Sequence, residues 1–182
     1  DCLKDYFDES KGRVKRGIYE MTMMDMLHKF VLPHTAASNS SLCELLQSQE
    51  DYRQYVGLAE TIAIHTWKDT LFVTVIKALL EHFKDKPNII VWFDLFSNNQ
   101  HRATTLPYEW WATTFKSAIK DFGHMVMVLT PWNNPIPLTR GWCVYEAYCC
   151  KDTGSTFEIA MTHENKEAFI NDVEYNTEKE IH

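Results

Sequence analysis

The alternation of short apolar segments with amphipathic ones after Gly57 is the feature that most constrains the fold of this chain. Four segments are short, apolar and rich in β-branched or aromatic residues, as buried strands are: residues 61–65, 88–96, 124–130 and 157–161. Three intervening segments repeat apolar side chains at helical spacing: residues 71–83, 108–122 and 139–150. Gly123 marks the end of the second helix. This β-α-β-α-β-α-β order predicts an α/β fold, with a doubly wound parallel sheet of the flavodoxin-like type and helices on both faces.

The region before this alternation, residues 1–58, is predicted to be an N-terminal helical extension of a domain formed by residues 59–182. Helical spacing predicts one helix over residues 19–32, ended by Pro33, and a second over residues 42–55. The first helix carries an apolar stripe made of Met23, Met26, Leu27 and Phe30. Because an exposed stripe of this kind is unfavourable, we expect the extension to pack on the domain.

Composition and charge exclude several classes of function. The 182 residues are 45% hydrophobic, which suits one full core. The net charge of −7 argues against binding to nucleic acid, because that affinity depends on clustered lysine and arginine. No apolar run approaches the roughly 20 residues that span a bilayer, so we expect no membrane association. Five cysteines without a CxxC or HExxH motif indicate free thiols in the cytoplasm and no bound metal.

The expected binding region lies beyond the carboxyl ends of the strands, where open parallel sheets bind ligands. The candidates for substrate binding there are His65, Trp67, Asp94, Arg102, Trp132 and Trp142. The tryptophans can stack on a base or fill the core, and Asp94 can bind ribose hydroxyls or cap a turn. Arg102 can donate to phosphate. The six glycines form neither GxGxxG nor GxxxxGK, so stacking and side-chain hydrogen bonds would have to hold a nucleotide.

Glu146 is the candidate catalytic residue, because it lies among apolar and aromatic neighbours on a predicted helix. A buried carboxyl group is costly unless it is paired, its pKa rises, and such groups are often functional. The alternative is a structural ion pair with Arg140 or with another buried basic residue. Together, Asp94 and Glu146 can form the pair of carboxyl groups that cleaves a glycosidic bond.

Four segments resemble, in order and spacing, the conserved boxes of TIR domains: TIAIHTWKDTLF (residues 61–72), IIVWFDLF (89–96), MVMVLTPW (125–132) and WCVYE (142–146). The pattern is most similar to a divergent TIR type of protists and algae, and the likeness covers about residues 59–162. A complete TIR domain has a fifth strand and a final helix, so the resemblance implies a shortened C-terminal end.

The resemblance also implies an activity. Glu146 matches the catalytic glutamate of TIR domains that cleave NAD, which is a substrate there and not a cofactor. The products would be nicotinamide and ADP-ribose or a cyclic isomer, made in signalling or defence such as innate immunity. Trp67 and the loop after Asp94 would border the NAD pocket. Copies of the same chain or other TIR domains would be the partners.

Three alternatives to this enzyme stay open. Many TIR domains act only as non-catalytic modules for self-association or for docking onto other TIR domains. Nucleoside deoxyribosyltransferases share the flavodoxin-like layout and also use a glutamate. A hydrolase built on Cys143 and His65 is less favoured, because the sequence has no nucleophile-elbow motif.

Overall fold

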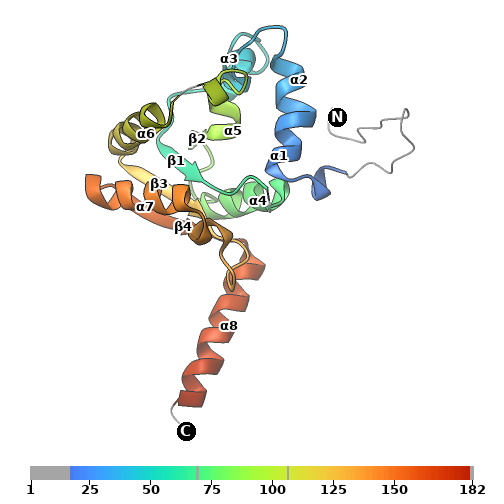
Figure 1. Ribbon diagram of the computed structural model, residues 1–182. Coiled ribbons are helices and arrows are strands. Elements are labelled where there is room, and N and C mark those ends of the chain that lie inside the picture. Colours follow the sequence, from blue (N-terminus) through green and yellow to red (C-terminus); the bar gives the residue numbers. More distant parts are fainter. Residues whose placement is uncertain (1–16, 69, 106, 181–182) are drawn as a thin grey trace.

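The computed structural model describes residues 17–68, 70–105 and 107–180, so the first sixteen residues of the predicted extension lie outside it. Its centre is a sheet of four parallel strands in the order β2-β1-β3-β4 (Figure 1). The strands are β1 (Thr61–Ile64), β2 (Val91–Phe93), β3 (His124–Val128) and β4 (Thr156–Ala160). This strand order is that of a flavodoxin-like sheet, and it confirms the predicted α/β class.

Strand pairing decides which side chains face each side of the sheet. Ile62 of β1 pairs with Trp92 of β2 and with Met125 of β3. Because side chains alternate along a strand, these three residues point to one face. The residues one position further along point to the other face: Ala63, Phe93 and Val126. The two sets belong to two separate hydrophobic clusters, one on each side of the sheet.

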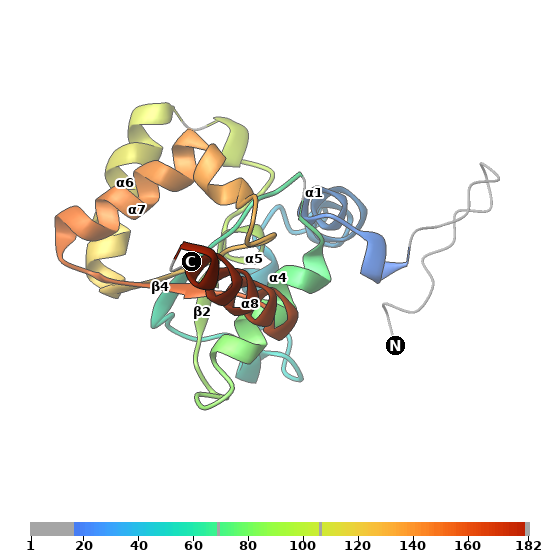
Figure 2. The same ribbon diagram turned by 90° about the horizontal axis from the view of Figure 1, so that it is seen from below.

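Helices cover both faces of the sheet (Figure 2). α4 (Phe72–His82), which connects β1 to β2, packs Val75 into the cluster on one face. α6 (Tyr108–Phe122) and α7 (Gly141–Thr153) lie side by side on the other face, where Ile119 is fully buried. The chain runs from β1 out to β2 and then back across to β3 and β4. Right-handed crossovers in these two directions place their helices on opposite faces.

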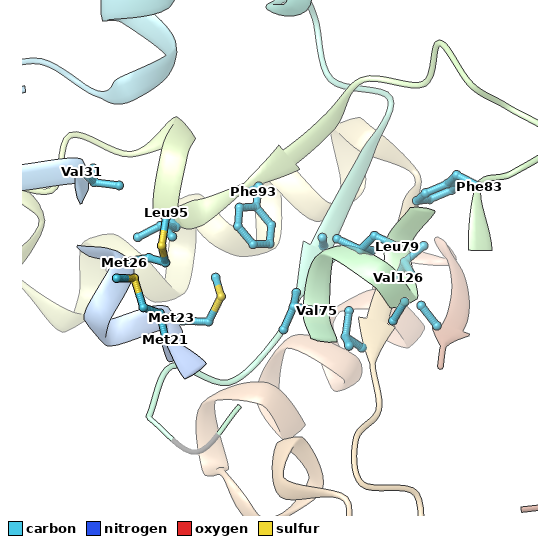
Figure 3. Close-up of a cluster of buried hydrophobic side chains, with 14 of the residues drawn as sticks. Met21, Met23, Met26, Val31, Val75, Leu79, Phe83, Phe93, Leu95 and Val126 are labelled. Carbon is cyan, nitrogen blue, oxygen red and sulfur yellow. The ribbon is translucent and has the colours of Figure 1, made fainter. Parts of the chain in front are cut away.

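The segment before β1 shares the hydrophobic core on the α4 face (Figure 3). Its helical part consists of α1 (Met23–Met26), a π-helical turn η3 (Leu27–Val31) and α2 (Leu32–Thr35). The buried side chains that meet there include Met23, Met26, Val31, Val75, Leu79 and Leu95. The predicted apolar stripe is therefore part of a core that the extension and the sheet have in common.

Two predicted boundaries in this segment are wrong. Pro33 was expected to end the first helix, but the helical backbone continues through α2. The backbone N–H of Leu32 donates to the carbonyl of Leu27, a π-type bond that changes the register just before the proline. Pro33 then lies in the first turn of α2, where a missing N–H is tolerated. The second helix is shorter than predicted, with α3 at Leu42–Gln47 and a 3₁₀ turn, η4, at Arg53–Tyr55.

The remaining elements are η2 (Ile18–Glu20), α5 (Asp94–Ser97), η5 (Ala103–Thr105), η6 (Ile136–Thr139) and α8 (His163–Glu180). α8 extends away from the body of the protein (Figure 1). It leaves Phe169, Ile170 and Val173 exposed. Within the described part of the chain, no helix combines the length and the apolar character that crossing a bilayer requires.

Candidate active site

A cavity of about 360 Å³ lies at the carboxyl ends of β1 and β2. Its walls come from these two strands, from the segments that follow them, from α6 and from the start of α7. The lining residues are Ala63, Ile64, His65, Trp67, Trp92, Asp94, Asn98, Gln100, Ala103, Phe115, Arg140, Trp142, Cys143 and Glu146. This is the end of the sheet at which parallel α/β proteins bind ligands, and the volume suits a small organic group.

Asp94 is the first residue of α5, directly after β2, and its carboxylate is held by three groups. Oδ1 lies 2.7 Å from Nε2 of His65 and accepts a hydrogen bond of 2.7 Å from the backbone N–H of Leu95. Oδ2 accepts a hydrogen bond of 2.9 Å from Nε1 of Trp67. Because a carboxylate only accepts, Nε2 of His65 is the donor in its contact. These bonds fix the orientation of the Asp94 carboxylate.

His65 and Trp67 follow β1 and line the cavity, and both side chains also bind Asp94. Nε2 of His65 and Nε1 of Trp67 donate to Asp94, and Nδ1 of His65 lies 3.3 Å from the carbonyl of Thr66, so these atoms are already engaged before a ligand enters. The ring of His65 lies 4.7 Å from the ring of Phe93, centroid to centroid, and its side chain is 1% exposed. We therefore assign His65 and Trp67 to holding Asp94, with their rings forming part of the wall.

Glu146 lies on α7 and is 4% exposed, as the apolar residues around it in the sequence lead one to expect. Burial, and next the negative charge of Asp94, raise the pKa of the Glu146 carboxyl group from 4.5 to about 8. A hydrogen bond from Trp142 and the positive charge of Arg140 act in the opposite direction but are outweighed. The net shift is upward, so burial and the charge of Asp94 outweigh Arg140 at this carboxyl group and favour its protonated form.

Cys143 also lines the cavity, but its surroundings do not favour a nucleophile. Burial, and next the charge of Glu146, raise the pKa of the thiol to about 11. Its Sγ lies 4.0 Å from the backbone oxygen of His65, and the imidazole of that residue is turned to Asp94. A thiol with a raised pKa, whose neighbouring imidazole is engaged with Asp94, is a poor nucleophile, so the geometry does not support a Cys143–His65 hydrolase.

Two of the predicted binding residues lie elsewhere. The ring of Trp132 packs against Phe169 of α8 at a centroid distance of 5.7 Å, and its backbone N–H donates to Asn165. Arg102 is exposed, and its charge acts on Glu44 of α3. Neither is among the described residues that line the cavity.

Trp92, Phe115 and Arg140 line the cavity without having been predicted as binding residues. Trp92 and Phe115 meet edge to face with their centroids 5.6 Å apart. Trp92 could have been found from its position, because it alternates with the buried Phe93 and must face the opposite side of the sheet. No comparable pattern marks Phe115, which is one of several aromatic residues on α6.

Comparisons with family models, with curated proteins and with solved structures find no match for this chain. The cavity is therefore the guide to function. The described residues contain no group of three or more His, Cys, Asp or Glu side chains that could hold a metal ion. They do bring together a buried carboxyl group with a raised pKa, a hydrogen-bonded carboxylate and several aromatic rings, an arrangement suited to cleaving a glycosidic bond.

Proposed function

We propose that this chain cleaves the bond between nicotinamide and ribose in NAD and acts as a TIR-type NAD glycohydrolase. The observation that carries the proposal is the position of Glu146, a carboxyl group that is 4% exposed and yet lines the same small cavity as Asp94. Buried carboxyl groups with displaced pKa values are concentrated at catalytic sites. Two carboxyl groups in unlike surroundings can divide the tasks of acid or base and of charge stabiliser.

The proposed reaction breaks the C–N bond between the ribose C1′ and the pyridinium nitrogen. The bonding electrons go to the nitrogen, so nicotinamide leaves as a neutral molecule and positive charge develops on the ribose. Water then adds to C1′ and loses a proton, which gives ADP-ribose, or an internal nucleophile gives a cyclic isomer. Asp94 stabilises the developing charge. Glu146, whose ionised form is favoured once the positively charged ring of NAD is bound beside it, accepts the proton from the nucleophile.

The walls suit the nicotinamide end of the substrate. Trp92, Phe115 and Trp142 offer aromatic surface for a planar charged ring, to which aromatic faces are attracted. At about 360 Å³ the cavity takes this end of the molecule rather than the whole dinucleotide. Arg140 is half-buried at the N-cap of α7, and its guanidinium would bind a phosphate of the remaining part of the substrate.

We also propose that the protein acts in the cytoplasm. Cys43, Cys143, Cys149 and Cys150 are free thiols in the described residues, as in proteins of a reducing cytoplasm. NAD is available there, and its consumption would serve signalling or defence.

A second candidate function is a non-catalytic module that binds copies of itself or other TIR domains. The observation that favours it is the open edge of the sheet at β4, which pairs with β3 and exposes Phe157 and Ile159 at 40% and 45%. Exposed edge strands readily pair with another chain. The two functions are compatible, since self-association can also bring active domains together.

The proposal is tested by comparing NAD with its reduced form, NADH, as substrate. Nicotinamide in NAD carries a positive charge and leaves as a neutral molecule, whereas the reduced ring is neutral and a poor leaving group. We expect chromatography to show nicotinamide and ADP-ribose, or its cyclic isomer, formed from NAD and no cleavage of NADH. Failure of concentrated, folded protein to cleave NAD would contradict the proposal and favour the interaction module.

A further inference from the structure

The cavity confines two acidic groups, and their neighbours compensate a negative charge on Asp94 more fully than one on Glu146. Asp94 has His65, Trp67 and a backbone N–H as donors. Glu146 is 4% exposed and is surrounded mainly by apolar and aromatic side chains. A second negative charge there would lie in a medium of low dielectric beside the first, which is strongly unfavourable.

We propose that the cavity takes up a cationic aromatic ring in exchange for the proton on Glu146. The inference depends on the proposed function only for the identity of that ring, the pyridinium group of a nicotinamide nucleotide. The entering positive charge adds to the hydrogen bond of Trp142 and the charge of Arg140, which alone are outweighed by burial and by Asp94. The proton then leaves, and the net charge within the walls stays the same.

The other charged or titratable groups that line the cavity near Glu146 are consistent with an exchange of the proton on Glu146. From the segment after β1 comes His65, whose Nε2 is 2.7 Å from Asp94 and is thus already engaged. From α5 comes Asp94, whose charge opposes ionisation of Glu146. From the start of α7 come Arg140, which favours ionisation too weakly to prevail, and Cys143, whose raised pKa keeps it a neutral thiol.

The exchange sets the direction of the pH dependence of binding. Burial raises the pKa of Glu146 to about 8 in the free protein, and a cation next to the carboxylate lowers this pKa in the complex. Between these two pKa values, binding releases one proton. The affinity for the cation therefore rises by about tenfold for each pH unit up to pH 8 and levels off above it.

The test uses 1-methylnicotinamide, a pyridinium with no ribose that cannot be cleaved. Its dissociation constant is measured by calorimetry between pH 6 and pH 8.5, and the protons released are counted in two buffers of different ionisation enthalpy. For the parent protein we expect the affinity to increase about tenfold per pH unit below pH 8, with close to one proton released at pH 7. Glu146→Gln should bind with an affinity that does not depend on pH, because its amide does not ionise.

The matched control is Glu167→Gln, the same change of chemistry at an exposed position of α8, which should keep the pH dependence of the parent. The proposal is overturned if the parent does not bind the probe, if its affinity is independent of pH, if Glu146→Gln keeps the dependence, or if Glu167→Gln loses it. If the protein cleaves NAD but binds the probe without releasing a proton, the proposed function stands and the proton exchange is wrong. If it binds the probe with release of a proton but does not cleave NAD, the exchange stands and the proposed function is wrong.

Discussion

At the residue scale, two carboxyl groups line one cavity, and their surroundings have opposite effects: hydrogen-bond donors surround Asp94, whereas burial disfavours a negative charge on Glu146. Asp94 is surrounded by donors, and Glu146 by apolar side chains and by the charge of Asp94 itself. Burial and the charge of Asp94 raise the pKa of Glu146, and unlike surroundings of this kind divide the roles in catalytic carboxyl pairs. We therefore expect the free energy of unfolding to depend on the protonation of Glu146, and the pKa of Glu146 to depend on Asp94.

The buried carboxyl group should make the parent protein less stable as pH rises. The folded-state pKa of Glu146, about 8, is above the 4.5 of an ordinary glutamate, so its protonation stabilises the fold at low pH. This contribution is full below pH 4.5 and is lost between pH 4.5 and pH 8. Relative to Glu146→Gln, we expect the parent to lose on the order of 1.4 kcal/mol of unfolding free energy per pH unit across this window. Urea unfolding of both proteins at pH 5, 6, 7 and 8 measures this loss. A difference in unfolding free energy that stays constant over this range would refute the raised pKa of a buried Glu146.

Replacement of Asp94 by Asn should lower the pKa of Glu146, because it removes the negative charge that opposes ionisation. The measurement is a titration of the Glu146 carboxyl carbon by ¹³C NMR in the parent and in Asp94→Asn. Asp152→Asn is the matched control, since this residue is on the same helix α7 but pairs with Lys116 on the surface. The control should titrate like the parent, and an unchanged or higher pKa of Glu146 in Asp94→Asn would show that the two acids are not coupled.

Part of this site can be predicted from the sequence, and the hydrogen bonds between residues of different strands cannot. The burial of Glu146 follows from its apolar neighbours on one helix, which is local information. The hydrogen bonds of His65 and Trp67 to Asp94 depend on the register between β1 and β2, which no local pattern contains. Trp132 follows β3 as expected, but its ring packs against α8, whose direction depends on tertiary contacts.

At the scale of elements, local patterns predicted where most helices and strands occur. The helix α6 has the predicted bounds because Gly123, with a φ of 65°, ends it in a left-handed conformation. Strand β2 is much shorter than the predicted residues 88–96, because the chain turns into α5 at Asp94. An apolar run alone does not distinguish a strand from the short helix that follows it, and here that short helix carries a site residue.

The turn at the end of α6 should depend on glycine. Gly123→Ala places a side chain at a φ of 65°, so we expect a loss of about 1 kcal/mol in unfolding free energy. Gly141→Ala is the matched control: Gly141 is the first residue of α7, and an added Cβ would meet nothing within 4 Å. Alanine there should leave stability unchanged or raise it. Equal effects of the two changes in urea unfolding would contradict the assigned role of Gly123.

At the scale of the whole molecule, the helical segment before β1 and the sheet form one core. Met23 and Met26 of α1 are buried with Val75 of α4 and Leu95 of α5 (Figure 3). The sequence predicted the apolar stripe of this segment from its spacing. It did not predict that the π-helical turn before Pro33 lets the helix continue, because such a turn has no clear sequence pattern. We therefore expect the described segment before β1 and the sheet to unfold together.

This shared core can be tested with two methionines of the same short helix. Met23→Ala removes a side chain that is fully buried and should cost about 2–5 kcal/mol of unfolding free energy. Met24→Ala changes a neighbouring, half-buried methionine of α1 and should cost less, with the same effect on helix propensity. Both values come from urea unfolding followed by circular dichroism. If the two changes have equal small effects, α1 is not part of the cooperative core.

The most direct test of the central claim is the rate of nicotinamide release from NAD by concentrated protein and by its Glu146→Gln variant. Glu167→Gln, a change of the same chemistry at an exposed position of α8, is the control. We predict that the parent and the control release nicotinamide at equal rates and that Glu146→Gln is slower by about 100-fold or more. A variant that is folded and releases nicotinamide at the parent rate would contradict the account, as would a folded parent protein that releases none.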